Sequence, residues 1–274
     1  MRALATQRLR NGLLALAALA IVGAGVYVDH LALRDSSFLS GWLLVAAFVV
    51  LAAFNARKKL PFLPLGSAAG WLRLHAWLGL VTVAIFAMHG GWSWPGGGLE
   101  ALLWGLFVVL LVTGIGGLAL SRLAPRPLTE HGERVLFERI PRYRAQLAGE
   151  VEDLVTAAID EHGSSAIATH YSRRLRPYFA RPRHVLRHLL GSHAPVRRLQ
   201  RELRALERYL SASGRETLDA IEARVVAKDN LDYHYAWQGL LKGWLFAHIP
   251  LTYATAVVAA VHIVTAYAFA ASTP

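Results

Sequence analysis

The chain has 274 residues, of which 55% are hydrophobic, a composition too apolar for an ordinary soluble domain of this length, so membrane-spanning segments are expected first. It contains no cysteine, which excludes disulfides, cysteine-ligated iron–sulfur clusters, thiolate zinc sites and covalently attached c-type haem. The net charge of +11 would suggest nucleic-acid binding in a soluble protein, but in a membrane protein it indicates topology and contact with anionic lipid.

Five segments are apolar enough to cross a bilayer as helices, which takes about 20 residues. In chain order they are Gly12 to Val28, Gly41 to Phe54, Trp71 to Gly90, Ala101 to Leu120 and Gly243 to Ala268. The second is the shortest and can be extended by starting near Phe38. The first could be a secretory signal, since arginines precede it, but it lacks a small-x-small cleavage site before Asp29, which favours a retained helix.

These segments predict an all-α membrane bundle of five transmembrane helices. Residues 1–121 carry the first four helices, residues 122–242 form a basic α-helical insert between the fourth and fifth, and residues 243–274 form the fifth helix and a tail. The orientation in the membrane is predicted from the Lys and Arg residues in the short segments that flank the apolar runs. Seven basic residues lie on one side, Arg2, Arg8, Arg10, Arg57, Lys58, Lys59 and Arg73, against Arg34 on the other.

This charge bias predicts a multi-pass protein of the cell (inner) membrane, with a cytoplasmic N-terminus and insert and with the C-terminus outside. Trp92 and Trp94 lie just beyond the third segment, where they indicate an interfacial aromatic belt.

Four histidines lie within the third and fifth segments. The third reads WLRLHAWLGLVTVAIFAMHGG and holds His75 and His89, and the fifth reads WLFAHIPLTYATAVVAAVHIV and holds His248 and His262. Both pairs are 14 residues apart, which on an α-helix is close to four full turns and a rise of about 21 Å. Each pair therefore shares one helix face, with one histidine near each edge of a hydrocarbon core about 30 Å thick.

Topology pairs these histidines between helices. The third and fifth segments are separated by two crossings and run parallel, so that His75 faces His248 at the cytoplasmic level and His89 faces His262 at the outer level. A porphyrin iron has two axial positions that suit neutral imidazole nitrogens, so two haem b groups are predicted, with these four residues as ligands. The alternatives are histidines that only pack, or a metal or proton site without haem. Four histidines in two equal spacings favour the haems.

Several neighbouring residues could contact these haems. Gly79, one turn after His75, would let a flat porphyrin edge approach the backbone, although close helix packing through glycine is equally common in membranes. Arg73, Arg122 and Lys242 are candidates to pair with haem propionates, with the topology signal itself as their alternative role. Pro250 is expected in the first turns of its helix, where a missing N–H costs little.

Paired histidines 14 residues apart on parallel helices resemble the membrane cytochrome b superfamily. Ligands on the third and fifth helices are similar to those of the ferric reductase-like transmembrane domain, and the spacing is similar in the two-haem core of cytochrome b in bc-type complexes. The resemblance covers Trp71 to Leu120 and Gly243 to Ala268. It implies that His75 with His248 holds an inner haem and His89 with His262 an outer one. The chain departs from the ferric reductase-like pattern in its five predicted helices and its long insert.

The insert, residues 122–242, holds 21 basic and 15 acidic residues and has helical periodicity. Prolines divide it into about five or six expected short helices, and no phosphate-binding or catalytic motif is present. The stretch RPRHVLRHLLGSH offers His184 and His188 four residues apart, and then His193. These could hold a metal on one helix face, but the surrounding arginines favour a basic interfacial or lipid-facing helix.

The expected function is electron transfer across the membrane by a di-haem b-type cytochrome subunit, between a quinol or cytoplasmic donor and an outer-side redox partner. With no flavin or iron–sulfur motif of its own, the chain is expected to work beside a multihaem cytochrome or a dehydrogenase, with membrane lipids and without nucleic acid. Quinone is a further candidate cofactor. No catalytic residue is predicted. The alternatives are a self-contained membrane reductase for a metal chelate, oxygen or quinone, and a non-redox scaffold or proton-relaying transporter.

Overall fold

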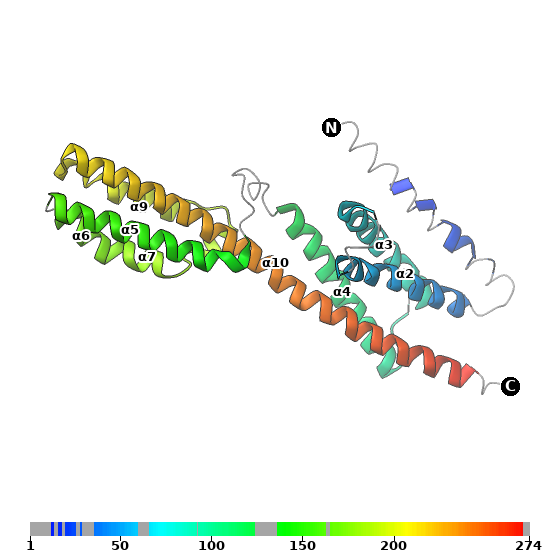
Figure 1. The fold of residues 1–274 in the computed structure, drawn as a ribbon. Coiled ribbons are helices and arrows are strands. Elements are labelled where there is room, and N and C mark those ends of the chain that lie inside the picture. The colour runs from blue at the N-terminus through cyan, green and yellow to red at the C-terminus, as the bar shows by residue number, and fades with distance from the viewer. Residues whose placement is uncertain are drawn as a thin grey trace. The chain divides into compact units, whose positions relative to one another are not determined.

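The structure is a computed structural model that describes residues 36–59, 66–91, 93–123, 136–162 and 165–270, together with positions 12–13, 16–17, 20–25 and 28. The predicted first span, Gly12 to Val28, is described only in part, and its described positions are helical. Trp92 lies outside the described residues. Within the described residues the chain is helical and contains no strand (Figure 1).

Four described helices are long and apolar enough to cross a membrane: α2 (Ser36–Lys59), α3 (Ala68–His89), α4 (Gly98–Leu123) and α10 (Ala212–Ala270). They contain the second to fifth predicted spans. Each of α2, α4 and α10 begins and ends beyond the apolar run that predicted it, because polar residues at a bilayer edge still suit a helix. The N-terminus of α3 is capped by Ser67, whose hydroxyl oxygen accepts a hydrogen bond from the Gly70 N–H at 3.1 Å.

The prediction for the start of the fifth helix was wrong. The helix does not begin near Gly243 but at Ala212, so that α10 runs for 59 residues through the expected boundary between the insert and the last span. Pro250 consequently lies deep inside α10 and not in its first turns. Because proline has no N–H, the carbonyl group four residues earlier, that of Phe246, lacks its usual helical donor. The predicted boundary rested on hydropathy, which rises at Gly243. The backbone is helical on both sides of Gly243, so hydropathy does not mark the start of the helix.

The chain divides into two compact units, one of residues 1–119 and 246–274 and the other of residues 120–245. In the first unit α2 packs against α3. Its few buried residues include three hydroxyl side chains, those of Ser40, Thr82 and Thr255. Many of its large apolar side chains are exposed, as expected for helices whose outer surface faces lipid.

The second unit is built from α5 (Ile140–His162), α6 (Ser165–His170), α7 (Arg176–Ala180), α8 (Val185–Leu189), α9 (Ala194–Arg204) and the N-terminal part of α10. Short turns at Phe137–Arg139, Tyr171–Leu175 and Glu207–Tyr209 join them. Pro177 and Pro195 lie in the first turns of α7 and α9, where a missing N–H costs nothing. The core is an apolar cluster from α5, α7, α9 and α10 that includes Val151, Phe179 and Ile221.

Candidate cofactor site in the membrane helices

The structure brings the four histidines of α3 and α10 together as two pairs. The ring centroids of His75 and His248 lie 6.5 Å apart, with an angle of 71° between the ring planes. Those of His89 and His262 lie 6.3 Å apart, with an angle of 85°. These are the partners expected from parallel helices, and in both pairs the rings meet edge-on at a similar separation.

The width of both gaps can be compared with a metal centre. An imidazole nitrogen binds a transition-metal ion at about 2.0–2.1 Å and lies about 1.1–1.2 Å from its ring centre, so two rings on opposite sides of one ion have centroids about 6.2–6.6 Å apart. The observed separations of 6.5 and 6.3 Å fall within this range. In the part of the chain that the structure describes, no group of three or more His, Asp or Glu side chains could hold a bare metal ion. Two imidazoles would suit a metal ion that is carried by a bound cofactor, which would supply the other ligands.

On the α2 side, hydrogen bonds fix which nitrogen of each ring carries the proton. Nδ1 of His75 lies 3.2 Å from the carbonyl oxygen of Leu51, and Nδ1 of His89 lies 3.1 Å from the carbonyl oxygen of Ser37. A carbonyl can only accept, so in both rings Nδ1 donates and Nε2 carries the lone pair. Nε2 is therefore the nitrogen through which either ring would bind a metal.

On the α4 side, Thr113 gives the same result for His248. Its hydroxyl donates to the carbonyl oxygen of Leu110 at 3.0 Å, and its oxygen lies 2.9 Å from Nδ1 of His248. Because the single hydroxyl hydrogen is used, Nδ1 of His248 is the donor and Nε2 again has the lone pair. For His262, no hydrogen bond to the ring is found among the described residues. Three of the four rings are thus held in one tautomer by residues outside α3 and α10.

The residues that orient the rings were not found from the sequence. Ser37, Ser40 and Leu51 lie on α2, and Thr113 lies on α4, far along the chain from the histidines they contact. Ser40 is 1% exposed and its hydroxyl lies 3.1 Å from Nδ1 of His89. The available signal was a hydroxyl residue inside an apolar helix, which is expected to find a hydrogen-bond partner there.

A glycine allows the His89 ring to approach α2 closely, whereas the space beside the His248 ring would accommodate a Cβ. A Cβ at Gly41 of α2 would lie 3.1 Å from Cε1 of His89, and a Cβ at Gly114 of α4 would lie 3.7 Å from Cε1 of His248. Gly79, the glycine predicted to contact a porphyrin, has no heavy atom within 4 Å of its added Cβ. The space beside Gly79 is therefore open, and no side chain among the described residues fills it. The tight position at Gly41 had been seen only as the start of an apolar run.

A buried threonine lies midway between the two histidines of each helix. Thr82 is seven residues after His75, and Thr255 is seven residues after His248. Each is 7% exposed and donates to a carbonyl of its own helix, Thr82 to Gly79 at 2.7 Å and Thr255 to Leu251 at 2.8 Å. Seven residues are close to two helical turns, so each threonine shares the face of its histidines.

The predicted partners of propionate groups lie in different surroundings. Arg73, two residues before His75, is exposed and belongs to the same compact unit as the histidines. Arg122 and Lys242 belong to the other unit. There Lys242 forms an ion pair with Glu138, and its ammonium lies 4.4 Å from the centre of the Phe137 ring. Of the three, Arg73 is the one that belongs to the unit of the histidines.

Within the described residues, the alternative of a metal held by His184 and His188 on one helix face is not supported. His184 precedes α8 and has a left-handed backbone with φ of 58°, so the two residues do not share a helical face. His188 is 1% exposed, and its Nε2 lies 3.6 Å from Asp229, which also faces Nδ1 of His193 at 3.5 Å. Burial lowers the pKa of His188, against the opposing effect of Asp229 and Asp232.

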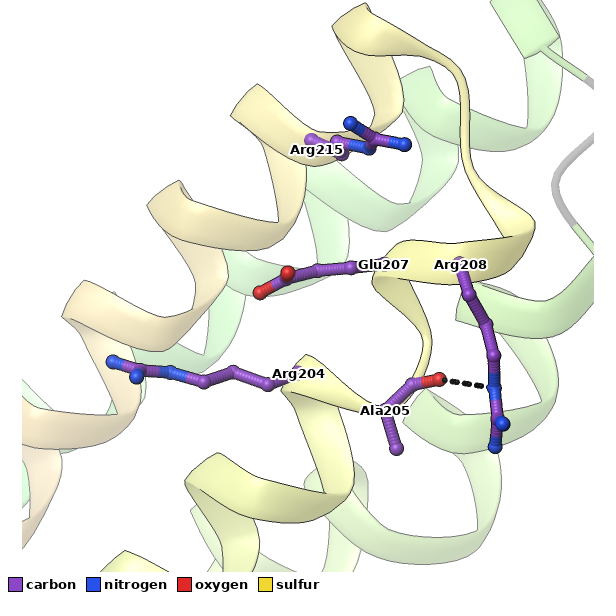
Figure 2. Close-up of a pocket in the computed structure, with 5 residues that line it drawn as sticks. All are labelled: Arg204, Ala205, Glu207, Arg208 and Arg215. Atoms are coloured by element: carbon purple, nitrogen blue, oxygen red, sulfur yellow. Dashed lines mark hydrogen bonds between the residues drawn. The ribbon is translucent and has the colours of Figure 1, made fainter.

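A shallow pocket of about 500 Å³ lies in the second unit and is lined by Arg204, Ala205, Glu207, Arg208 and Arg215 (Figure 2). Its guanidinium groups do not converge. Arg204 extends away from Arg208 and pairs with Glu222, while Nε of Arg208 donates to the carbonyl of Ala205 at 3.2 Å. The pocket therefore lacks the arrangement that would cradle an anion.

Comparisons of the chain with protein families, with curated proteins and with solved structures find no match.

Proposed function

We propose that the chain is a di-haem b-type cytochrome that carries electrons across a membrane, as a subunit beside a quinol or cytoplasmic donor and an outer-side redox partner. The observation that supports this most is the equal separation of the two ring pairs, 6.5 and 6.3 Å between centroids, which suits one metal between each pair. Four apolar helices long enough to span a membrane provide the setting.

The chain's own residues would hold and orient each group. His75 with His248 and His89 with His262 would supply axial nitrogens, and the Nδ1 hydrogen bonds to Leu51, Ser37 and Thr113 would keep Nε2 directed to the metal. Haem, when bound, supplies the one-electron chemistry, while ligands, hydrogen bonds and burial set its potential. Arg73 would meet the propionates of the group beside His75.

The proposed orientation keeps the N-terminus in the cytoplasm, because the basic flanks lie on that side. The His75 level is then the inner one and the His89 level the outer one. Quinone is a possible further cofactor, and a multihaem cytochrome or dehydrogenase is the proposed kind of partner, since the chain has no cysteine for an iron–sulfur centre.

Haem content tests the proposal directly. The purified full chain is expected to give a pyridine haemochrome signal equal to two haems per chain, with low-spin spectra. His89→Ala or His262→Ala is expected to remove one of the two, and His75→Ala or His248→Ala the other. His193→Ala, which changes an exposed histidine of the insert, is the control and is expected to retain both.

A purified chain without haem would exclude the cytochrome and would favour the scaffold or proton-relay alternative. Loss of both haems from every single variant, with the protein still folded, would contradict the assignment of two separate pairs. A chain that binds both haems and reduces a metal chelate, oxygen or quinone when it is given a soluble electron donor alone would favour the self-contained reductase.

A further inference from the structure

Two leucines of the insert are almost fully exposed. Leu186 in α8 is 75% exposed, and Leu190, which directly follows α8, is 84% exposed. They are four residues apart across one helical turn and so lie on the same side of it. Such an apolar pair on the surface of a folded unit is unfavourable in water unless something covers it.

The charge around these leucines has one sign. Residues 162–201 contain nine arginines and no aspartate or glutamate. Arg181 and Arg187 are exposed on either side of Leu186 in the sequence, and no ion pair to either is found within the described residues. An apolar pair flanked by unneutralised arginines is typical of a segment that lies in the interface of an anionic membrane.

A buried ionic network holds this segment in shape. Lys228 and Asp232 of α10 are 0% and 1% exposed and form an ion pair at 2.5 Å. The Lys228 ammonium also donates to the carbonyl of Arg181 at 3.2 Å, and Asp232 accepts a hydrogen bond from the Arg183 N–H at 3.0 Å.

The backbone at both ends of α8 is constrained as well. His184 and Gly191 have φ of 58° and 68°, a conformation that costs energy for histidine. A buried ion pair stabilises little compared with apolar packing. The buried ion pair and the constrained backbone therefore add little stability themselves. Their role is explained if they hold Leu186 and Leu190 in a fixed position on the surface.

We propose that the loop from Arg181 to Gly191 docks on an anionic lipid surface. Leu186 and Leu190 would enter the boundary between headgroups and acyl chains, and Arg181 and Arg187 would meet lipid phosphates. A bilayer is favoured over an acidic protein as the docking partner. The chain itself has helices that can span a bilayer, so a membrane lies close to the insert. The proposal is independent of haem.

The absence of cysteine permits a clean test in the full chain. Leu190→Cys provides a single site for an environment-sensitive fluorophore, and the protein is reconstituted in vesicles of phosphatidylcholine alone or of phosphatidylcholine with phosphatidylglycerol. Tyr209→Cys is the matched control, because Tyr209 is also a large exposed apolar residue, at 67%, beside an arginine. In the vesicles with phosphatidylglycerol, the label at position 190 is expected to shift to shorter wavelength and to be quenched by lipids brominated in their acyl chains, with a several-fold smaller effect in phosphatidylcholine alone.

Three further variants test the separate parts of the segment. In the labelled chain, Arg181→Gln and Arg187→Gln are each expected to weaken the interaction about five-fold in vesicles with phosphatidylglycerol, and Leu186→Asp is expected to abolish the quenching. Equal quenching at positions 190 and 209, or quenching at position 190 that does not depend on phosphatidylglycerol, would overturn the proposal. Absence of quenching in both lipids would overturn it as well and would favour a protein partner.

Discussion

The Nδ1 atoms of His75, His89 and His248 each donate to an acceptor on another helix. Each of these single hydrogen bonds sets both the tautomer and the orientation of one imidazole ring. A hydrogen bond from Nδ1–H also makes the imidazole a stronger electron donor, which favours the oxidised metal.

Removing one such acceptor should therefore shift one potential. Thr113→Val keeps the shape of the side chain but takes away the oxygen 2.9 Å from Nδ1 of His248. The reduction potential of the haem at that level is expected to rise by on the order of 20–60 mV, which corresponds to about 0.5–1.5 kcal/mol for one hydrogen bond. A redox titration of the haem absorbance measures it. The control is Thr265→Val, because the Thr265 hydroxyl contacts the His262 carbonyl and not a ring. Unchanged potentials in Thr113→Val would contradict this role.

Gly41 tests the steric side of the same argument. In Gly41→Ala the new Cβ would lie 3.1 Å from Cε1 of His89, so the ring must move. Overpacking of this kind costs about 1–3 kcal/mol, so the haem at the His89 level is expected to bind roughly 5- to 150-fold more weakly while the other remains. Haem per chain, measured after dilution, reports the change. Gly105→Ala, whose Cβ has nothing within 4 Å, is expected to keep both haems. Equal haem loss in the two variants would argue against a specific contact at Gly41.

At the scale of elements, the buried ion pair between Lys228 and Asp232 of α10 holds the backbone segment before α8 in place. Lys228 and Asp232 are one turn apart, and each also bonds the backbone of the segment from Arg181 to Arg183. The sequence shows the spacing of four residues but not the burial, since such pairs on helices are usually exposed. Burial makes each member dependent on the other, because a lone charge in the core is costly.

Asp232→Ala is expected to lower the free energy of unfolding of the insert by about 3–5 kcal/mol, because it leaves the Lys228 ammonium buried without its partner. Adding Lys228→Met should restore much of this loss. Hydrogen exchange of the α8 and α9 amides gives the measurement in the full chain. Glu222→Ala, which breaks a pair with the exposed Arg204, is expected to cost only about 0–1 kcal/mol. A failure of Lys228→Met to rescue Asp232→Ala would show that the loss has another origin.

At the scale of the whole molecule, α10 contributes to both compact units, with residues 212–245 in one and 246–270 in the other. The unit of residues 120–245 also contains histidines that folding buries. Burial lowers the pKa of His188, and it lowers those of His170 and His184 in the same direction. The folded unit therefore holds these rings neutral at a pH where the unfolded chain binds protons.

This difference predicts the direction of the pH dependence. Because the folded pKa of His188 lies below its unfolded value of about 6.5, the unfolded state takes up protons first as the pH falls. The free energy of unfolding of the insert is expected to decrease as the pH drops through about 6.5 and to level off below the folded pKa. Hydrogen exchange of α8 and α9 at a series of pH values measures it. His188→Gln should reduce this pH dependence, and an unchanged dependence would assign it to His170 and His184.

The sequence by itself determined α2, α3, α4 and the C-terminal part of α10 as apolar runs, and it predicted the pairing of His75 with His248 and of His89 with His262. These follow from local periodicity and from the number of crossings, both of which are properties of the chain alone. Only the tertiary structure decided that Ser37, Leu51 and Thr113 orient the rings, that α10 begins at Ala212, and that Lys228 and Asp232 are buried. Hydropathy cannot show which neighbouring helix offers an acceptor, because that depends on how the helices are rotated against each other.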